Sequence, residues 1–227
     1  MTQRAGAGPT HYHHVTDLPD VVSIFPLSGA LLLPRGSLPL NIFEPRYLAM
    51  IDNALATSRM IGMVQPETGA EDDDIPPVYA TGCAGRITSF SETEDRRYLI
   101  SLTGVCRFHI DQEVINDQPY RQAEVNFSPF EADLTPMTDE ARLDREHLLN
   151  ALRVYLQAQS LNADWESIEN APGETLVNSL CMICPFDPSE KQALLEAGSV
   201  EERAATLIAL IEMASVDAPG GAGSSLN

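Results

Sequence analysis

Residues 25–47, FPLSGALLLPRGSLPLNIFEPRY, contain the signals for a strand, a turn and the start of a helix in close succession. Within Leu38–Phe43 apolar residues stand at every second position, the period of a strand with one face in a core. Pro45 suits the first position of a helix, because the N–H that it lacks would be unpaired there. Apolar residues then recur at three- and four-residue steps, which predicts a helix over about Pro45–Ser58: Tyr47, Leu48, Ile51, Ala54 and Leu55.

Strand patterns dominate the chain on both sides of this helix and end near Phe127. The connecting segment Ser91–Arg96 is polar and charged, as is typical of a hairpin tip. Several strands, one early helix and short turns predict an open antiparallel barrel or curled sheet. The predicted strands are Val21–Leu27, Leu38–Phe43, Met60–Val64, Val78–Phe90, Arg97–Ile110 and Tyr120–Phe127.

Helical patterns replace strand patterns after the segment Ser128–Thr138. Thr135 as N-cap and Pro136 at the first helical position predict a long helix that ends near Ser160. Further helices are predicted around Trp165, over Pro172–Cys184, from a capping box at Asp187 and Glu190, and from Ser199 through Met213. The predicted class is α+β, with a flexible arm at 1–19, a β-rich domain at 20–129, a helical bundle at 130–216 and a flexible tail at 217–227.

The composition excludes several classes of partner. The chain has 227 residues, 44% of them hydrophobic, and 33 acidic against 14 basic residues give a formal net charge of −19. Such a charge repels nucleic acid and anionic membranes, whose binding relies on clustered Lys and Arg. No apolar run is long enough to cross a bilayer, and the first residues lack the pattern of a secretion signal, so we expect a cytoplasmic location.

Cysteines and histidines offer weak signals for metal binding. Cys181 and Cys184 form a C-x-x-C, but a zinc site needs two further ligands, so we interpret the pair as buried residues on one helix face. The cluster at His11–His14 comes with no nearby Cys or carboxylate pair to close a coordination sphere, and the acidic run Glu71–Asp74 lacks the spacing of a calcium loop. We therefore expect no metal and no cofactor, with zinc, a redox motif and calcium as the weaker alternatives.

The lysine content excludes two kinds of catalytic chemistry. Lys191 is the only lysine, and it stands beside Glu190 in the first turn of a predicted helix, where we expect it to be charged and solvated. It fits neither a phosphate-binding P-loop nor a serine-lysine peptidase. No Gly-x-Ser-x-Gly or His-Glu-x-x-His motif occurs. His109 and His147 leave an unrecognised triad open, so a hydrolase remains the weakest alternative to a non-enzymatic protein.

The ordered motifs resemble a known family. Phe25-Pro26-Leu27, Leu33-Pro34 and Ile42–Tyr47 are followed by Gly62–Val64, Ala84–Ile87, Leu102–Phe108 and Asp187–Glu196. In this order they resemble the amino-terminal, substrate-binding domain of the Lon proteases, over about Leu18–Met213. The resemblance implies a pseudo-barrel, a helical second half and the recognition of unfolded or damaged polypeptides. In Lon proteases an ATPase module and a serine-lysine peptidase follow, and we expect this chain to stop before either.

The expected function is therefore non-catalytic polypeptide binding, with an adaptor for one specific protein as the alternative and the oligomeric state open. The candidate binding surface is the run Leu31, Leu32 and Leu33, with Met60 and Met63 as weaker candidates. Three successive leucines in a strand cannot all face one side, so Leu32 is expected to point outward. The alternative is that all five side chains lie in the core.

The motif Glu44-Pro45-Arg46-Tyr47 has two interpretations. Glu44 and Arg46 form a charged pair in a peptide groove, or Glu44 accepts amide hydrogen bonds at the start of the helix while Arg46 and Tyr47 brace the adjoining loop. We favour the second, structural interpretation, because carboxylates are common at helix N-termini.

Overall fold

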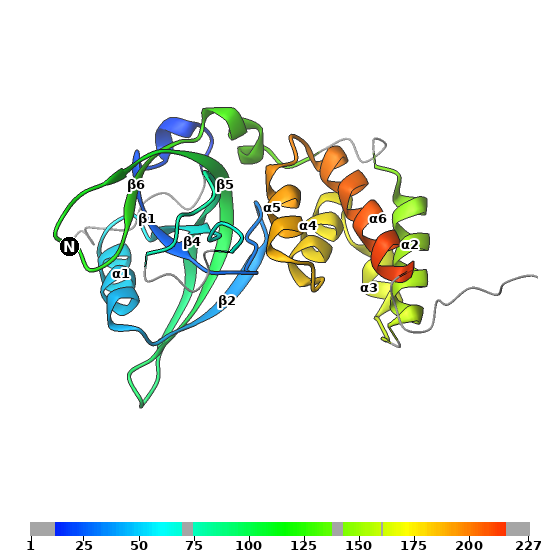
Figure 1. Cartoon of the computed structure of the whole chain (residues 1–227), viewed down its shortest axis with the longest axis horizontal. Helices are drawn as coiled ribbons and strands as arrows, with labels where there is room; N and C mark the ends of the chain where they lie inside the picture. Colours follow the sequence, from blue (N-terminus) through cyan, green and yellow to red (C-terminus); the bar gives the residue numbers. More distant parts are fainter. Residues whose placement is uncertain (1–11, 70–74, 138–142, 160, 217–227) are drawn as a thin grey trace, which may run out of the picture. The chain divides into compact units, whose positions relative to one another are not determined.

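A computed structural model describes residues 12–69, 75–137, 143–159 and 161–216. The chain divides into two compact units, Met1–Pro136, which is rich in β-structure, and Met137–Asn227, which is helical (Figure 1). The α+β class is thereby confirmed. The division lies between Pro136 and Met137, a few residues beyond the predicted boundary at 129/130.

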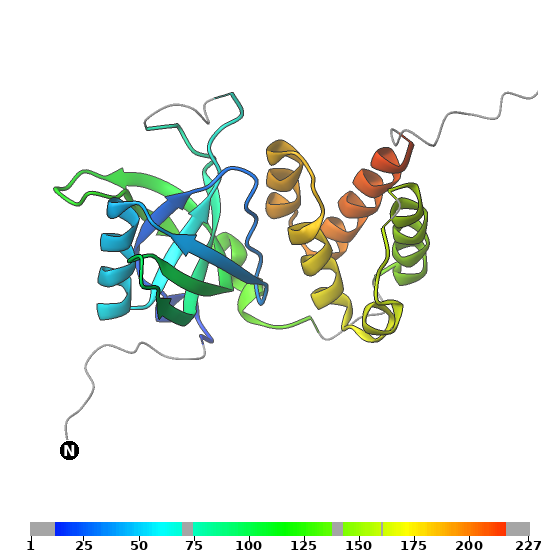
Figure 2. The ribbon, with the colours of Figure 1, turned by 90° about the horizontal axis from the view of Figure 1, so that it is seen from below.

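The β-rich unit is a sheet that closes on itself (Figures 1 and 2). The strand order is β2-β5-β4-β3-β1-β6, and β5 also pairs with β6. Closure depends on the 17-residue β5: its first part pairs with β2 and its last part with β6, while β4 runs along the other side. The strands are β1 (Val21–Pro26), β2 (Ser37–Ile42), β3 (Met60–Val64), β4 (Thr81–Glu92), β5 (Tyr98–Val114) and β6 (Gln122–Asn126).

One strand pair differs from the predicted antiparallel arrangement. β1 and β3 run parallel, with Ile24 opposite Gly62 and Phe25 opposite Met63. A parallel pair needs a long crossover to bring the chain back in the same direction. Here β2 and helix α1 (Pro45–Ala56) supply it, so the early helix is the connection that makes the parallel pair geometrically feasible.

The segment before β1 is ordered where it is described, in contrast to the predicted flexible arm. Val15–Asp17 form a 3-10 turn, η1, and Leu18 is buried. The hydroxyl of Tyr12 accepts a hydrogen bond from Arg86 Nη1 at 2.9 Å, and the Tyr12 ring packs against the barrel core. His11 and the residues before it lie outside the described residues, as do 71–74 of the acidic run.

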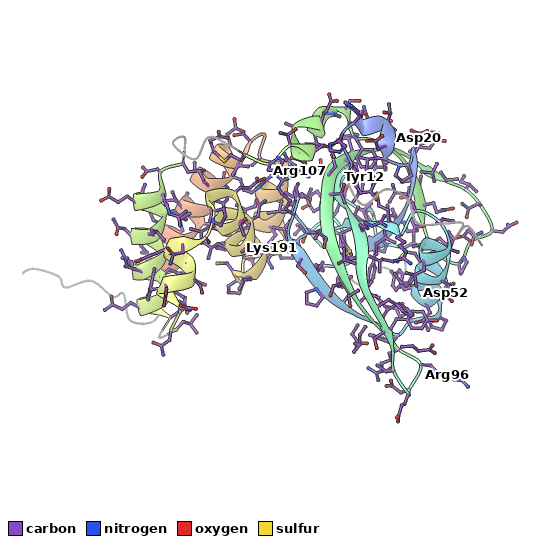
Figure 3. The ribbon with its side chains drawn as sticks, turned by 180° about the vertical axis from the view of Figure 1, so that it is seen from behind. Tyr12, Asp20, Asp52, Arg96, Arg107 and Lys191 are labelled. Carbon is purple, nitrogen blue, oxygen red and sulfur yellow. The ribbon has the colours of Figure 1, made fainter. Side chains whose placement is uncertain are left out.

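The end of the β-rich unit contains a buried ion pair that was not predicted from the sequence, and one of its partners, Arg107, is labelled in Figure 3. Arg107 of β5 donates from Nε to Asp133 Oδ2 and from Nη2 to Asp133 Oδ1, both at 2.8 Å. Asp133 belongs to the short helix η2 (Ser128–Leu134), which packs on β5. The ion pair explains why η2 belongs to the β-rich unit: a buried charge is tolerated only with a close partner.

The predicted cap at Thr135 is wrong. The backbone N–H of Thr135 donates to Ala132 O at 3.1 Å and ends η2 instead of starting a long helix. The first described helix of the second unit, α2 (Arg145–Ala158), begins at Asp144, whose side chain accepts from the N–H of His147 at 3.1 Å. Residues 138–142 of the predicted helix lie outside the described residues.

The helical unit contains α2, α3 (Trp165–Asn170), α4 (Gly173–Ile183), α5 (Pro188–Glu196) and α6 (Val200–Val216) (Figure 2). The predicted capping box at Asp187 and Glu190 is confirmed, with the N–H of Asp187 donating to Glu190 Oε2 at 2.8 Å. Helix α6 packs against α2, α4 and α5. None of the helices in the described ranges is long and apolar enough to cross a membrane.

Candidate functional site

The five side chains predicted to bind polypeptide are all buried. The exposed fractions of Leu31, Leu32 and Leu33 are 2%, 1% and 0%, and Met60 and Met63 are each 3% exposed. The prediction that Leu32 points outward is wrong, because residues 30–33 are not in a strand and successive side chains therefore need not alternate. The structure agrees with the alternative prediction that all five side chains lie in the core.

Two glycines of the barrel make room for the leucine run. A Cβ at Gly85 of β4 would lie 2.6 Å from Leu32 Cδ2, and one at Gly104 of β5 would lie 2.0 Å from the carbonyl oxygen of Leu33. The turn that follows is tied to the same strand: the N–H of Arg35 donates to Gly104 O at 2.8 Å, and the N–H of Gly104 donates to Gly36 O at 2.9 Å. The leucine run is thus a buried, structural part of the β-rich unit.

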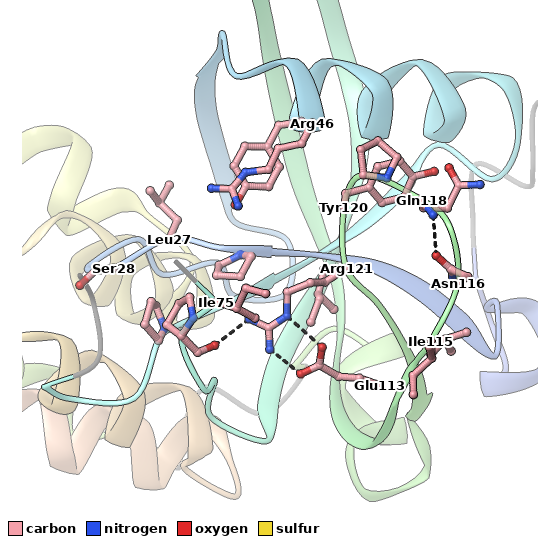
Figure 4. A pocket seen from close by; sticks show the side chains of 17 residues that line it. Leu27, Ser28, Arg46, Ile75, Glu113, Ile115, Asn116, Gln118, Tyr120 and Arg121 are labelled. Carbon is pink, nitrogen blue, oxygen red and sulfur yellow. Dashed lines mark hydrogen bonds and ion pairs between the residues drawn. The ribbon is translucent and has the colours of Figure 1, made fainter. Parts of the chain in front are cut away.

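A cavity of about 560 Å³ elsewhere in the β-rich unit is a better candidate for a binding site (Figure 4). The end of β1, the start of α1, a proline-containing loop and the β5–β6 connection form its walls. The residues that line the cavity include Arg46, Tyr47, Pro66, Ile75, Pro76, Glu113, Ile115, Gln118, Tyr120 and Arg121. A cavity of this size with both apolar walls and a few polar groups is typical of ligand sites.

Ion pairs fix the two arginines of the cavity. Arg121 donates from Nε to Glu113 Oε2 at 2.9 Å, makes a second short contact with the same carboxylate, and donates from Nη1 to Pro76 O at 2.7 Å (Figure 4). It therefore ties the β5–β6 connection to the proline loop. Arg46 pairs with the Glu44 carboxylate at 2.9 Å, and both of these side chains are about half exposed.

Two buried tyrosines supply the aromatic walls. The Tyr47 ring packs on Phe25 with a centroid distance of 4.3 Å, and the Arg46 guanidinium lies 4.6 Å from the centre of the same ring. Desolvation raises the pKa of Tyr47, so its hydroxyl is a protonated donor at neutral pH. Within the described part of the chain, the hydroxyls of Tyr47 and Tyr120 make no hydrogen bond, and both are available to a ligand.

Two isoleucines make the mouth of the cavity apolar. Ile75 is 75% exposed and Ile115 is 101% exposed. Ile115 directly follows the strand β5 in the segment Val114–Pro119, and its side chain is among those shown in Figure 4. An isoleucine left wholly in water beside a cavity is stabilised when a ligand covers it.

Some residues of the Glu44–Tyr47 motif form the start of helix α1, and others line the cavity. Pro45 occupies the first turn of α1 as predicted, but the Glu44 carboxylate does not cap the helix. Its backbone oxygen accepts from the N–H groups of Tyr47 and Leu48, each at 2.9 Å, while its side chain accepts from Arg46 Nε at 2.9 Å. The capping prediction is therefore wrong, and Arg46 and Tyr47 line the cavity.

The β5–β6 connection contributes much of the cavity wall but was not predicted to be part of a site. Asn116, Asp117, Gln118 and Pro119 indicate a loop, and the apolar Ile115 at its start was the one signal of an exposed contact residue. The role of Arg121 could not be found in this way, since its partner Pro76 O is distant in sequence.

The four cysteines are free and buried, as predicted for the C-x-x-C pair. Burial raises the pKa of the Cys106 and Cys181 thiols to about 12 and that of Cys184 to about 11, so these thiols are protonated at neutral pH. In the described ranges, no three His, Cys, Asp or Glu side chains are grouped to hold a metal ion.

None of the other described candidate groups for catalysis is among the residues that line the cavity. Lys191, which is labelled on α5 in Figure 3, is only 8% exposed, so the expectation that it is solvated is wrong, and desolvation lowers its pKa. His147 Nε2 pairs with Glu212 at 2.8 Å on the helical unit, whereas His109 is a half-exposed residue of β5. The two histidines thus belong to different units.

Two solved structures that are similar in fold are N-terminal domains of Lon-type proteins. The Lon N-terminal domain protein from Xanthomonas campestris aligns with a TM-score of 0.60 and 22% identity, covering 83% of this chain and 97% of that chain. The N-terminal domain of the Mycobacterium avium complex Lon protease aligns with a TM-score of 0.61 and 18% identity, covering 84% and 97%. At these identities the likeness establishes the fold: a β-barrel unit followed by a helical unit.

The sequence establishes the family. The chain belongs to the ATP-dependent protease La (LON) substrate-binding domain family, whose profile matches residues 21–213. Lon protease of Parabacteroides distasonis is 29% identical over 201 residues, covering 85% of this chain and 24% of that protein. Lon protease 2 of Myxococcus xanthus is 30% identical over 111 residues, covering 48% and 13%. The chain thus spans a quarter or less of these relatives, and the match is to the substrate-binding domain rather than to the peptidase.

Proposed function

We propose that this chain is a non-catalytic recognition module that binds unfolded polypeptide segments in the cavity of the β-rich unit. One observation carries the proposal: the cavity places two tyrosine hydroxyls and the fixed guanidinium of Arg121 behind a mouth formed by two exposed isoleucines. Membership of the LON substrate-binding domain family supports a polypeptide as the ligand.

The two kinds of lining match the two parts of an extended polypeptide. Peptide N–H and C=O groups need hydrogen-bond partners when they leave water, and the hydroxyls of Tyr47 and Tyr120 supply both donors and acceptors. Apolar side chains of the ligand pack against Ile75, Ile115 and the prolines of the wall. Since every polypeptide has the same backbone, such a site binds many sequences and is selective for unfolded chains, whose backbone and apolar side chains are exposed.

Arg121 gives the cavity a fixed geometry before a ligand arrives. Its guanidinium is held by the Glu113 carboxylate and by Pro76 O, so little conformational entropy is lost when it forms one wall of a complex. Because its charge is already paired, we expect affinity to depend more on the apolar contacts of Ile115 than on charge.

A direct test measures binding of a fluorescently labelled, reduced and carboxymethylated model protein by anisotropy. Ile115→Ser removes the exposed apolar contact, and we expect a loss of affinity of about 3- to 10-fold. Leu99→Ser is the matched control, because Leu99 is a surface residue of β5, 46% exposed, that does not line the cavity. Equal affinity of the wild type and the Ile115 variant would place the binding surface elsewhere.

A second measurement separates this proposal from an adaptor for one protein. Competition by several unrelated unfolded chains at similar concentrations is expected for a polypeptide site of low sequence selectivity. Absence of binding to all of them, combined with one stoichiometric partner in a pull-down, would favour the adaptor.

A further inference from the structure

The helical unit has an apolar groove of its own, with a volume of about 410 Å³. Its lining is almost wholly apolar and comes from α2, α3, α4 and the segments next to them, including Leu152, Leu156, Leu161, Ile168, Leu176 and Ile183. Leu161 and Ile183 are 55% and 78% exposed. Two large apolar side chains at the surface of one groove indicate a contact surface rather than a part of the core.

The packing of the helices explains why this groove is open. Helix α6 packs against α2, α4 and α5, and it buries Leu207 and Ile211 completely. Within the described residues, neither α5 nor α6 contributes to the lining of the groove. The groove is therefore bounded by α2, α3, α4 and the segments next to them.

The helical unit as a whole is acidic. Among the described residues of the helical unit there are twelve Asp and Glu but only four Arg and Lys. Lys191 and Arg203 are buried, and Arg153 is paired with Glu169 at 2.7 Å. The fourth cation, Arg145, donates to the backbone oxygens of Ile168 and Glu169 at 3.0 and 2.9 Å.

Exposed acids adjoin the groove itself. Asp164 and Glu166 flank lining residues of the α3 region, and Asp187 follows the lining residue Pro185 by two positions. An apolar groove with an acidic surround complements a ligand that is apolar on one side and basic around it. A second copy of this chain does not fit that description, because its own net charge is −19.

We propose that the groove docks an amphipathic helical segment of another protein, with leucine-like residues on one face and Lys or Arg beside them. A groove between helices accepts a further helix, whose apolar residues at i, i+3, i+4 and i+7 form one stripe. The basic residues of the ligand meet the acidic surround and orient the segment. This site is separate from the cavity of the β-rich unit and does not depend on the function proposed for it.

The test uses the full chain and two synthetic probe helices of about 18 residues. One probe has a leucine stripe with lysine on its other faces, and the matched probe has glutamate in place of lysine. We expect the lysine probe to bind at least about 10-fold more tightly, measured by fluorescence anisotropy at low salt. The double variant Leu161→Ser/Ile183→Ser is expected to lose about 10-fold in affinity for the lysine probe.

Met213→Ser is the control, because Met213 is 57% exposed on α6 and does not line the groove; we expect it to bind like the wild type. Circular dichroism checks that every variant is folded. Equal binding of the two probes would overturn the charge argument. Binding of the lysine probe that survives the double substitution but disappears at high salt would show non-specific attraction to an acidic protein and would overturn the site. Failure of the lysine probe to bind at all would also overturn it.

Discussion

Two apolar segments outside the strands of the β-rich unit have opposite environments. Leu31–Leu33 are at most 2% exposed, whereas Ile115 is fully exposed. Both are followed within a few residues by a proline, and both connect elements of the same barrel. The difference lies in what faces them: the leucines meet glycines at 85 and 104, which leave space for them. Hydrophobicity in a loop therefore does not indicate a binding surface unless the opposing strand is known.

The largest effect is expected when the space under the leucine run is filled. In Gly104→Val the new Cβ would lie 2.0 Å from Leu33 O, a contact with backbone that no side-chain rotation relieves. We expect the variant to lose about 4 kcal/mol or more of unfolding free energy, or to fail to fold. Urea denaturation followed by circular dichroism measures this loss.

Gly29→Ala is the matched control for Gly104→Val. Gly29 has a positive φ of 71°, but nothing lies within 4 Å of the position of its Cβ. Only backbone strain is added there, at a cost of about 1 kcal/mol. A similar loss in both variants would mean that the contact between Gly104 and the leucine run contributes little.

The next largest effect is expected for Leu32→Ala, which leaves a cavity where Leu32 packs beside Gly85. Such a truncation of a buried leucine costs about 2–5 kcal/mol. The measurement is again the urea midpoint, with an unchanged m-value as evidence that the folded and unfolded states are otherwise comparable. A cost below about 0.5 kcal/mol would show that the Leu32 side chain points outward at the surface, as first predicted from the sequence.

The sequence was most informative about elements that depend on neighbouring residues. The strand over Ser37–Ile42, the helix from Pro45 and the capping box at Asp187 rest on local patterns, and all three are present. The family resemblance, carried by ordered motifs, is confirmed as well. Local periodicity and capping chemistry are properties of neighbouring residues, so they can be predicted without a tertiary structure.

The candidate site could be predicted only in part. Arg46 and Tyr47 were identified, but as residues of a structural joint, and the residues at 113–121 were missed because they meet the loop at 75–76 only in three dimensions. The packing of η2 on the barrel was missed for the same reason: Asp133 pairs with Arg107, a partner 26 residues earlier in the chain. Contacts between residues that are distant in the sequence produce no periodic pattern, so they cannot be predicted from local patterns.

A smaller effect tests whether the two units respond separately. Cys106 lies in the barrel and Cys181 in the helical unit, and both thiols are buried with their pKa raised to about 12. In Leu32→Ala we expect modification of Cys106 by N-ethylmaleimide to become about 10-fold faster or more, because local opening of the barrel exposes it. Peptide mass spectrometry should find that the rate of Cys181 modification is the same as in the wild type. Equal acceleration of both thiols would mean that the chain opens as one cooperative unit.

The smallest effect on stability is expected at Ile115, where the comparison began. Since its side chain is already in water, Ile115→Ser removes almost no buried surface and should change the unfolding free energy by less than about 0.5 kcal/mol. The same substitution is expected to weaken capture of unfolded protein, so the two measurements separate a binding residue from a core residue. A loss of more than about 1.5 kcal/mol of stability would show that Ile115 is covered in solution by part of the chain itself. The cavity behind it would then be closed before any ligand arrived, and the polypeptide would have to displace that cover.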